Sequence, residues 1–222
     1  MTPFPQHREV RPEILDSLPQ DHPDALRNRR DLRLINLLMG NFRWIGRNLA
    51  KAVTPTDTGL EIGAGDGWLG HHLRKGNRLP STVRIDGLDL WERPPHWPET
   101  WGWRRENITA FSDFGRYDFV LANLILHQFE DRELREIGRS LRTGPRLVLA
   151  CEPCRRPLHL KQFRLLKPFR LNRVSWHDGQ VSIRAGFRGD ELPRLLGLEE
   201  EHWNIRCGSS FLGAFRMAAV RR

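Results

Sequence analysis

One short stretch of the chain combines an acidic residue with alternating glycines. In GLEIGAGDGWLG, Glu61 is followed by glycines at positions 63, 65 and 67. A glycine loop between a strand and a helix lets the backbone approach a ligand closely, with a helix N-terminus behind it. A dinucleotide fingerprint would need its third glycine where Trp68 stands, and the Gly-Lys-Ser/Thr ending of a phosphate-cradling loop is missing. An acid at the strand end favours a cationic ligand over a pyrophosphate. The candidate ligand-binding residues of this stretch are Glu61, Gly63, Ala64, Gly65, Asp66 and Gly67, and an incidental glycine turn is the alternative.

A second acidic residue follows the next predicted strand, in RIDGLDLWERP. Asp89 stands where a carboxylate can accept hydrogen bonds from both hydroxyls of a ribose. Asp86 is the competing candidate, but the polar and proline residues after Asp89 mark the end of the strand. A solvated loop acid is the alternative interpretation. We therefore expect Asp89 to face the same ligand as Glu61.

The elements that must position these residues alternate between strand and helix. Strand-like segments occur at 59–62, 83–90, 117–122 and 146–150, with helical patterns at 68–75 and 132–141 between them, and residues 202–208 and 211–220 form a closing antiparallel pair. Alternation of this kind is typical of βαβ units and a parallel, doubly wound sheet. The sequence therefore predicts an α/β fold, mostly parallel and Rossmann-like, with an antiparallel final strand pair.

Two further segments lie outside this alternation. Residues 1–52 are predicted to form an irregular arm and two amphipathic helices, broken near Gly40 and Asn41, which together make an N-terminal helical cap. Residues 53–222 form the main domain, with a basic insertion at about 155–185 that holds one helix near 158–166. We expect the cap and the insertion to cover the ligand site together.

With these motifs in place, the chain resembles the class I S-adenosylmethionine-dependent methyltransferases, whose first two motifs have the form seen at Glu61–Gly67 and at Asp89. The resemblance implies a methyltransferase enzyme with S-adenosyl-L-methionine as its cofactor. Leu90 would then line the adenine pocket. In RRENITAF, Asn107 would read the adenine amino group and Ile108 would meet the ring, with an Asx turn at Asn107 as the alternative. In ANLILHQF, Asn123 would lie beside the methionine part of the cofactor.

The same resemblance places His127 opposite the transferable methyl group. An imidazole titrates near neutral pH, so His127 is the candidate catalytic base that would take a phenolic proton. The alternative is structural: His127 caps the following helix or forms hydrogen bonds within its loop. Gln128 stands where many relatives have a second histidine.

A narrower resemblance concerns the bacterial methyltransferases encoded beside type III polyketide synthases. It rests on residues 12–41, the ANLILHQF loop, the strand LVLACEP and the late stretch VSIRAGFRGDELPRLLG. It implies a small phenolic or polyketide-derived acceptor and O- or C-methylation, as part of secondary metabolism.

Composition limits the other function classes. The 36 Lys and Arg residues against 27 Asp and Glu give a net charge of +9, so RNA methylation through the basic cap and insertion is an alternative, although nucleic acid is the less favoured partner. A cofactor-binding protein without turnover is the second alternative.

No apolar run has the length of a membrane span and no signal peptide is evident, so we expect a cytoplasmic protein. Cys151 and Cys154 form a single CxxC pair, too little for a metal site. The oligomeric state is open.

Overall fold

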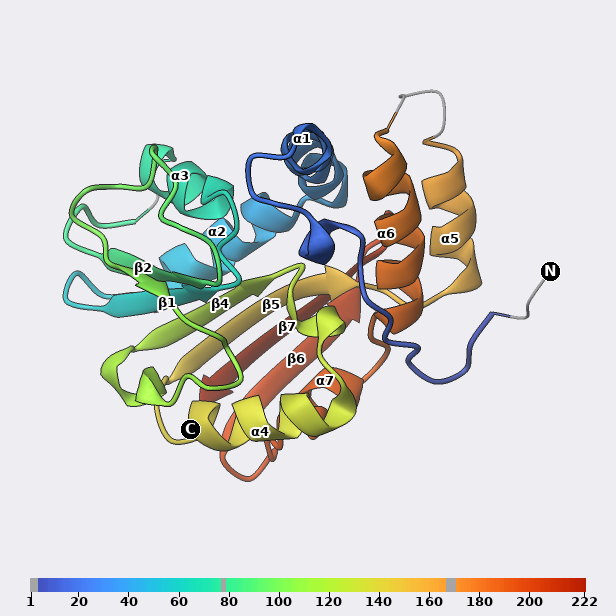
Figure 1. Ribbon diagram of the computed structural model, residues 1–222. Helices are drawn as coiled ribbons and strands as arrows, with labels where there is room; N and C mark the ends of the chain where they lie inside the picture. The colour runs from blue at the N-terminus through green and yellow to red at the C-terminus, as the bar shows by residue number, and fades with distance from the viewer. Residues whose placement is uncertain (1–3, 77–78, 167–170) are drawn as a thin grey trace.

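Seven strands form one sheet in the order β3-β2-β1-β4-β5-β7-β6 (Figure 1). The computed structural model describes residues 4–76, 79–166 and 171–222. The strands are β1 (Thr58–Ile62), β2 (Arg84–Asp89), β3 (Trp103–Arg105), β4 (Phe119–Asn123), β5 (Leu147–Pro153), β6 (Trp203–Ser209) and β7 (Ala214–Arg221). Strands β1 to β5 pair in parallel, whereas β7 runs antiparallel to both β5 and β6. The predicted α/β fold with an antiparallel final pair is confirmed.

Strand β3 is the element of the sheet that the sequence analysis missed. It has three residues, none of them buried, so it carries neither the length nor the apolar content that marks a strand in sequence. Its pairing with β2 is what holds it in the sheet. The segment after it, which contains Asn107, is thereby brought beside the end of β2.

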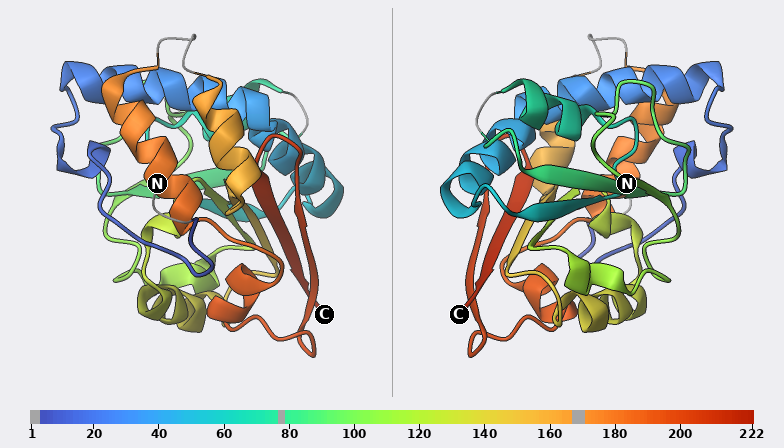
Figure 2. Two further views of the ribbon diagram at one scale, coloured as in Figure 1. Left: turned by 90° about the vertical axis from the view of Figure 1, so that its right-hand side faces the viewer. Right: turned by 90° about the vertical axis from the view of Figure 1, so that its left-hand side faces the viewer.

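Helices cover both faces of the sheet (Figure 2). They are α1 (Pro23–Met39), α2 (Asn41–Ala52), α3 (Trp68–Lys75), α4 (Asp131–Leu141), α5 (Pro157–Arg164), α6 (Arg173–Ala185) and α7 (Glu191–Leu195), with 3-10 turns η1 (Leu15–Ser17), η2 (Asp113–Arg116) and η3 (Leu126–Gln128). Gly40, in the left-handed conformation with φ of 67°, ends α1 and begins α2, as predicted. A capping box between Glu130 and Glu133 begins α4.

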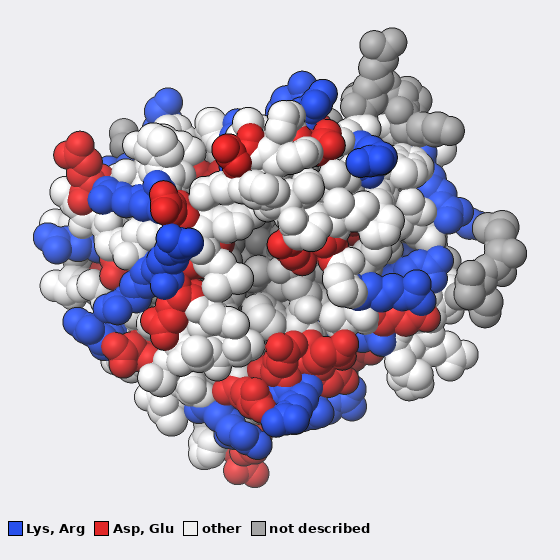
Figure 3. Space-filling model, viewed as in Figure 1, with Lys and Arg blue, Asp and Glu red and all other residues white. Residues whose placement is uncertain are grey.

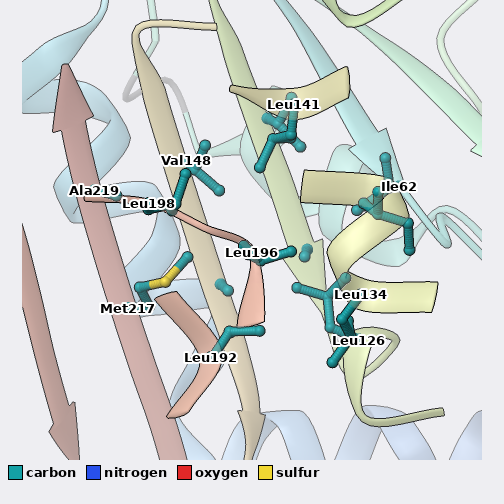
Figure 4. Packing of buried hydrophobic residues seen from close by; sticks show 14 of the residues in the cluster. Ile62, Leu126, Leu134, Leu141, Val148, Leu192, Leu196, Leu198, Met217 and Ala219 are labelled. Atoms are coloured by element: carbon teal, nitrogen blue, oxygen red, sulfur yellow. The ribbon is translucent and has the colours of Figure 1, made fainter. Parts of the chain in front are cut away.

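The core consists of two apolar layers, one on each face. On one face, side chains of α4 and α7 pack against the sheet; Leu134, Leu192 and Met217 belong to this layer (Figure 4). On the other face, Ile45 and Leu49 of α2 pack with residues of α3 and of the central strands. Every residue of β5 is buried, as expected for a strand covered on both faces. In the predicted N-terminal cap, α2 packs mainly on a face of the sheet, whereas α1 and the arm before it supply residues to the cavity at the carboxyl ends of the strands. The division of the chain at residue 52 remains a prediction.

The basic insertion contains two helices where one was predicted. Helix α5 lies close to the predicted position, and α6 follows it, while residues 167–170 between them lie outside the described residues. The buried residues of α6 include Ser175 and Asp178, so its inward face is partly polar and shows no clear apolar stripe in sequence. Helix α6 contacts α1, α5, η3 and β5. In the described part of the chain, none of the helices combines the length and the apolar character required to cross a membrane.

Candidate active site

The glycine loop, Gly63–Gly67, turns sharply from the end of β1 into α3. Its three glycines have φ values of 63°, 55° and 74°, a conformation that side chains disfavour. The backbone amide of Gly63 donates a hydrogen bond to the carbonyl oxygen of Leu88, which fixes the loop to β2. A Cβ atom on Gly63 would lie 2.3 Å from the side chain of Ile125. Glycine is therefore needed both for the turn and for the close approach of the loop after β4.

A cavity of about 590 Å³ opens at the carboxyl ends of the parallel strands. Figure 3 shows the hollow on this face, with acidic side chains at its rim. The predicted site residues that line it are Glu61, Gly63, Ala64, Gly65, Asp66, Asp89, Leu90, Asn107, Ile108, Asn123 and His127. Gly67 does not belong to the lining; it begins α3, and a Cβ there would lie 2.8 Å from the ring of Trp97. The fold thus brings residues from four separate segments to one cavity.

Glu61 is a buried carboxyl group without a complete set of partners. It is 3% exposed, and its Oε2 atom has no hydrogen-bond partner among the described residues. Burial raises the pKa of Glu61 well above its usual value, and the negative charges of Asp66 and Asp89 raise it further. The Oδ1 atom of Asn123 is likewise buried and unpartnered within the described chain. These two oxygens provide acceptor positions for a donor group on a ligand.

The two aspartates of β2 have different surroundings. One carboxyl oxygen of Asp89 accepts a hydrogen bond from Gly65 N at 2.8 Å and the other accepts from Trp91 N at 3.0 Å. Asp86 instead accepts from Gly102 N and from the hydroxyl of Tyr117, and it does not line the cavity. Burial raises the pKa of Asp89, although its backbone hydrogen bonds oppose the shift. Asp89 is thus the aspartate placed to meet a ligand.

Asn107 forms the Asx turn that the sequence left open. Its Oδ1 atom accepts hydrogen bonds from the backbone amide of Thr109 at 3.0 Å and from the Thr109 hydroxyl at 2.9 Å. Both lone-pair positions of that oxygen are therefore used within the turn. Ile108 is 6% exposed and lines the cavity beside Asn107. Leu90, which also lines the cavity, is 62% exposed.

His127 lies between two carboxylates. Its Nδ1 atom is 2.7 Å from Oε2 of Glu152, and its Nε2 atom is 3.3 Å from Oε1 of Glu13. The Glu152 carboxylate, which is fully buried, also accepts hydrogen bonds from the backbone amides of Ile125, Leu126 and His127. Burial acts to lower the pKa of His127, but the hydrogen bonds to Glu13 and Glu152 outweigh it and raise the pKa to about 9. His127 is therefore an imidazolium at neutral pH.

A strained backbone position lies between Asn123 and His127. Leu124 has a φ of 57°, the left-handed conformation. Among the described residues, it is the one residue other than glycine that has a positive φ. Its amide donates to the carbonyl oxygen of Cys151. Such strain is maintained only where surrounding contacts enforce it and it concentrates at functional sites. Leu124 lines the cavity, so the strain belongs to the candidate site.

Several polar residues of the cavity were missed by sequence reasoning, and Glu13, Asp16 and Arg29 among them come from the N-terminal segment. The guanidinium of Arg29 lies 4.1 Å above the ring of Trp91, and its Nε and Nη2 atoms are buried without hydrogen-bond partners in the described chain. In the sequence Arg29 is one of several arginines in RNRRDLR, and nothing local distinguishes it from a surface charge. Glu13 and Asp16 lie in a proline-rich arm, where nothing in the local sequence marks a charged residue as part of a site.

Cys151, Cys154 and Trp97 are buried and do not line the cavity. Cys151 and Cys154 are buried free thiols, and the described residues contain no group of three or more His, Cys, Asp or Glu side chains suited to a metal ion. Burial raises the pKa of Cys154. Trp97 packs edge-on against Trp101 and Trp103. Trp91, by contrast, lines the cavity.

Comparison with solved structures shows the fold. The plantazolicin methyltransferase BamL, in complex with a triazolic desmethylPZN analogue and S-adenosylhomocysteine, superposes with a TM-score of 0.69 at 10% identity, over 93% of this chain and 92% of that chain. The chain has a methyltransferase fold. Plantazolicin methyltransferase BpumL, with a monoazolic analogue, gives a TM-score of 0.68 at 12% identity, over 93% of this chain and 92% of its own. Magnesium protoporphyrin IX methyltransferase from Synechocystis PCC 6803, with bound S-adenosylhomocysteine, gives 0.56 at 14% identity, over 94% and 91%.

Comparison by sequence gives no such result: no protein-family model matches the chain, and neither does any curated protein. At identities of 10% to 14%, the methyltransferase fold rests on the path of the backbone. The roles of the site residues are therefore inferred from their geometry in this chain.

Proposed function

We propose that the protein is an S-adenosyl-L-methionine-dependent methyltransferase that acts on a small organic molecule. The observation that carries this proposal is the cavity itself, which joins the Glu61, glycine-loop and Asp89 cluster to a mostly apolar compartment beneath α1, α5 and α6. The methyltransferase fold supports it, because ligands of open α/β sheets bind at the carboxyl ends of the strands. A cavity of about 590 Å³ is in the range of small-molecule sites.

The residues present fit the cofactor. The unpartnered oxygens of Glu61 and Asn123 would accept from its amino group, whose positive charge suits a buried carboxyl. Asp89 would accept from the ribose hydroxyls, and the unpartnered guanidinium atoms of Arg29 would meet its carboxylate. Leu90 and Ile108 would contact the adenine. The cofactor supplies a methyl group on a sulfonium sulfur. Because Oδ1 of Asn107 is used by Thr109, reading of the adenine amino group by Asn107 would require opening of that turn.

We call the part of the cavity lined mainly by residues of the N-terminal arm, α1, α5 and α6 the acceptor compartment. Its apolar lining residues are Leu32, Ile35, Met39, Phe42, Phe163, Ile183 and Leu212. Methyl transfer is an in-line displacement, so the protein accelerates it chiefly by aligning the acceptor atom and by excluding water. An apolar compartment under helices does both for a molecule with a hydrocarbon or aromatic body. This shape favours a small molecule over RNA as the acceptor.

The phenolic or polyketide-derived acceptor follows from the narrower resemblance alone, whereas His127 as base follows from the broader methyltransferase resemblance and from the near-neutral titration of an imidazole. An imidazolium cannot take a proton, and His127 has its pKa raised to about 9. In our proposal His127 does not act as a base. It is a positioning residue, which holds one end of the acceptor compartment in place through its hydrogen bonds to Glu13 and Glu152. The acceptor is a small molecule with an apolar body.

Calorimetric titration with S-adenosylmethionine and with S-adenosylhomocysteine tests the proposed function. The wild-type protein should bind both, and Asp89→Ala should weaken binding by at least about tenfold, or about 1.4 kcal/mol, through loss of the ribose hydrogen bonds. Asp113→Ala, an exposed acid on η2 away from the cavity, serves as the control and should bind as wild type does. Absence of binding in the wild-type protein would refute the proposal.

A further inference from the structure

The acceptor compartment contains two carboxylates from the N-terminal segment, Glu13 and Asp16. Glu13 is 8% exposed and accepts hydrogen bonds from the Ser182 hydroxyl, from Gln128 Nε2 at 3.2 Å and from His127 Nε2 at 3.3 Å. Burial acts to raise the pKa of Glu13, but these hydrogen bonds, led by that from His127, bring it below its usual value. Glu13 is therefore ionised.

Asp16 stands one helical turn after Glu13, in η1, and is solvent-exposed. Partial burial in the cavity wall, and then the negative charge of Glu13, raise the pKa of Asp16 to about 6. The two groups thus repel each other. Among the described residues, neither forms an ion pair with a lysine or arginine. Glu13 already has the imidazolium of His127 as a charged partner, whereas Asp16 has no cationic partner among the described residues. A cation placed beside Asp16 and Glu13 would relieve their repulsion.

The positive charges of the cavity do not compensate for this pair. His127 carries one positive charge but lies between Glu13 and Glu152, so these three groups together retain one negative charge. Arg29 stacks on Trp91, and Arg33 pairs with Asp66 at 2.9 Å, both on the cofactor side of the cavity. With Asp16 ionised as well, the acceptor compartment carries a net negative charge, which is shared between the buried Glu13 and the solvent-exposed Asp16.

The sign of this charge discriminates between acceptor classes. When a phenolate attacks a sulfonium, the negative charge of the nucleophile cancels the positive charge of the donor. Carboxylates beside the acceptor atom would raise the energy of a phenolate before that step. When a neutral amine attacks, positive charge moves from sulfur to nitrogen, and carboxylates near the nitrogen stabilise the charge as it develops.

We propose, on the basis of the function proposed above, that the acceptor is an amine attached to an apolar body, and that the reaction is N-methylation, with Glu13 and Asp16 binding the nitrogen. The acceptor arrives as an ammonium ion and loses one proton to solvent water, with Asp16 at the exposed wall of the compartment as the relay. The nitrogen lone pair then forms the N–C bond as the S–C bond breaks. The products are an N-methylammonium ion and the neutral thioether S-adenosylhomocysteine.

The first arm of the test separates this inference from the proposed function. Titration with S-adenosylhomocysteine establishes the cofactor site alone; if it fails, the proposed function fails, whatever the acceptor. In the second arm, protein saturated with S-adenosylhomocysteine is titrated with matched pairs that share an aromatic body and differ in one group. Benzylamine with benzyl alcohol and 2-(naphthalen-1-yl)ethylamine with 2-(naphthalen-1-yl)ethanol are the probes.

The amine member of each pair should bind at least about tenfold more tightly than its hydroxyl partner. Glu13→Gln and Asp16→Asn, each of nearly unchanged size, should remove most of that preference and leave affinity for S-adenosylhomocysteine within about twofold of wild type. Asp113→Asn is the matched control and should keep the preference. With S-adenosylmethionine, mass spectrometry should detect the methylated amine. Equal, reversed or absent binding of the amines, or an unchanged preference in both variants, overturns the proposal. Asp16→Asn provides a second variant if Glu13→Gln fails to fold.

Discussion

At the scale of single residues, the arrangement around His127 links stability to pH. Its two carboxylate partners are far apart in the sequence: Glu13 precedes the first long helix, and Glu152 lies next to the last residue of β5. Each hydrogen bond stabilises the protonated ring, which burial alone would disfavour. The imidazolium therefore ties the N-terminal arm, residues 4–22, to the centre of the sheet.

A pH dependence of stability follows from this arrangement. The pKa of His127 rises from 6.5 in the unfolded chain to about 9 in the fold, so the folded protein binds this proton more tightly. Its contribution is complete below pH 6.5 and is lost as pH rises through about 9; full loss would be on the order of 3 kcal/mol. Urea unfolding at pH 6.5 and pH 9.5 measures the difference. His127→Gln should show a smaller decrease between the two values, and an equal decrease in both proteins would contradict this account.

Asp16 gives a second dependence, on binding. Its pKa of about 6 means that the side chain gains its negative charge as pH rises through that value. Affinity of the cofactor-saturated protein for benzylamine should therefore increase between pH 5 and pH 7, where the amine itself stays protonated. The increase should be smaller in Asp16→Asn. Titrations in matched buffers measure it, and a flat profile in the wild-type protein would be inconsistent with Asp16 as a ligand.

At the scale of elements, the glycine loop is constrained by its neighbours to different degrees. Gly63 and Gly65 both have positive φ, but a Cβ would lie 2.3 Å from Ile125 at Gly63 and would meet nothing within 4 Å at Gly65. The two positions share the conformational cost and differ in the steric one. The close contact between the loop after β1 and the loop after β4 is therefore a steric constraint that applies to Gly63 and not to Gly65.

Paired substitutions measure that demand. Gly63→Ala and Gly65→Ala should each lose about 1 kcal/mol or more from the left-handed conformation. Gly63→Ala should lose a further 1 to 3 kcal/mol, roughly the cost of overpacking, because Ile125 must move. Urea unfolding of both variants at one pH provides the comparison. If the two variants are equally stable, the contact with Ile125 is not the constraint described here.

At the scale of the whole molecule, one arginine fastens the N-terminal arm across the cavity. Arg8 Nη1 pairs with Asp131 at 2.6 Å, and its other nitrogens donate to the carbonyl oxygens of His127, Phe129 and Ala185. Its guanidinium also lies 4.4 Å over the ring of Phe187. The arm that carries Glu13 and Asp16 is therefore attached both to the loop after β4 and to the end of α6.

Release of this attachment should expose the arm. Arg8→Ala should make the segment before α1 cleave several-fold faster in limited proteolysis, because local opening becomes less costly. Arg11→Ala removes an exposed side chain with one partner, Glu9 at 3.6 Å, and should cleave at the wild-type rate. Mass spectrometry of the fragments locates the cuts. Equal rates in the two variants would show that Arg8 does not hold the arm.

Much of the fold was predictable from the sequence because its signals are local. Buried parallel strands appear as short apolar runs, α4 has strong helical periodicity, and the glycine loop requires a conformation that few other residues adopt. These features predicted the sheet, its final antiparallel pair and the positions of Glu61, Asp89 and Asn123 at one edge. The exposed strand β3 and the partly polar helix α6 have no such signal, since pairing and packing with distant segments hold them in place.

Only the tertiary structure decided the chemistry of the acceptor side. Glu13 and His127 are 114 positions apart, and no local pattern relates a carboxylate in a proline-rich arm to an imidazole after β4. The protonation of His127 depends on the burial of that pair together with Glu152. The sequence predicted which strand ends and which glycine turn lie at the cavity, because such features are encoded within a few residues. The charge that an acceptor meets there depends on long-range contacts, and the folded chain alone provides them.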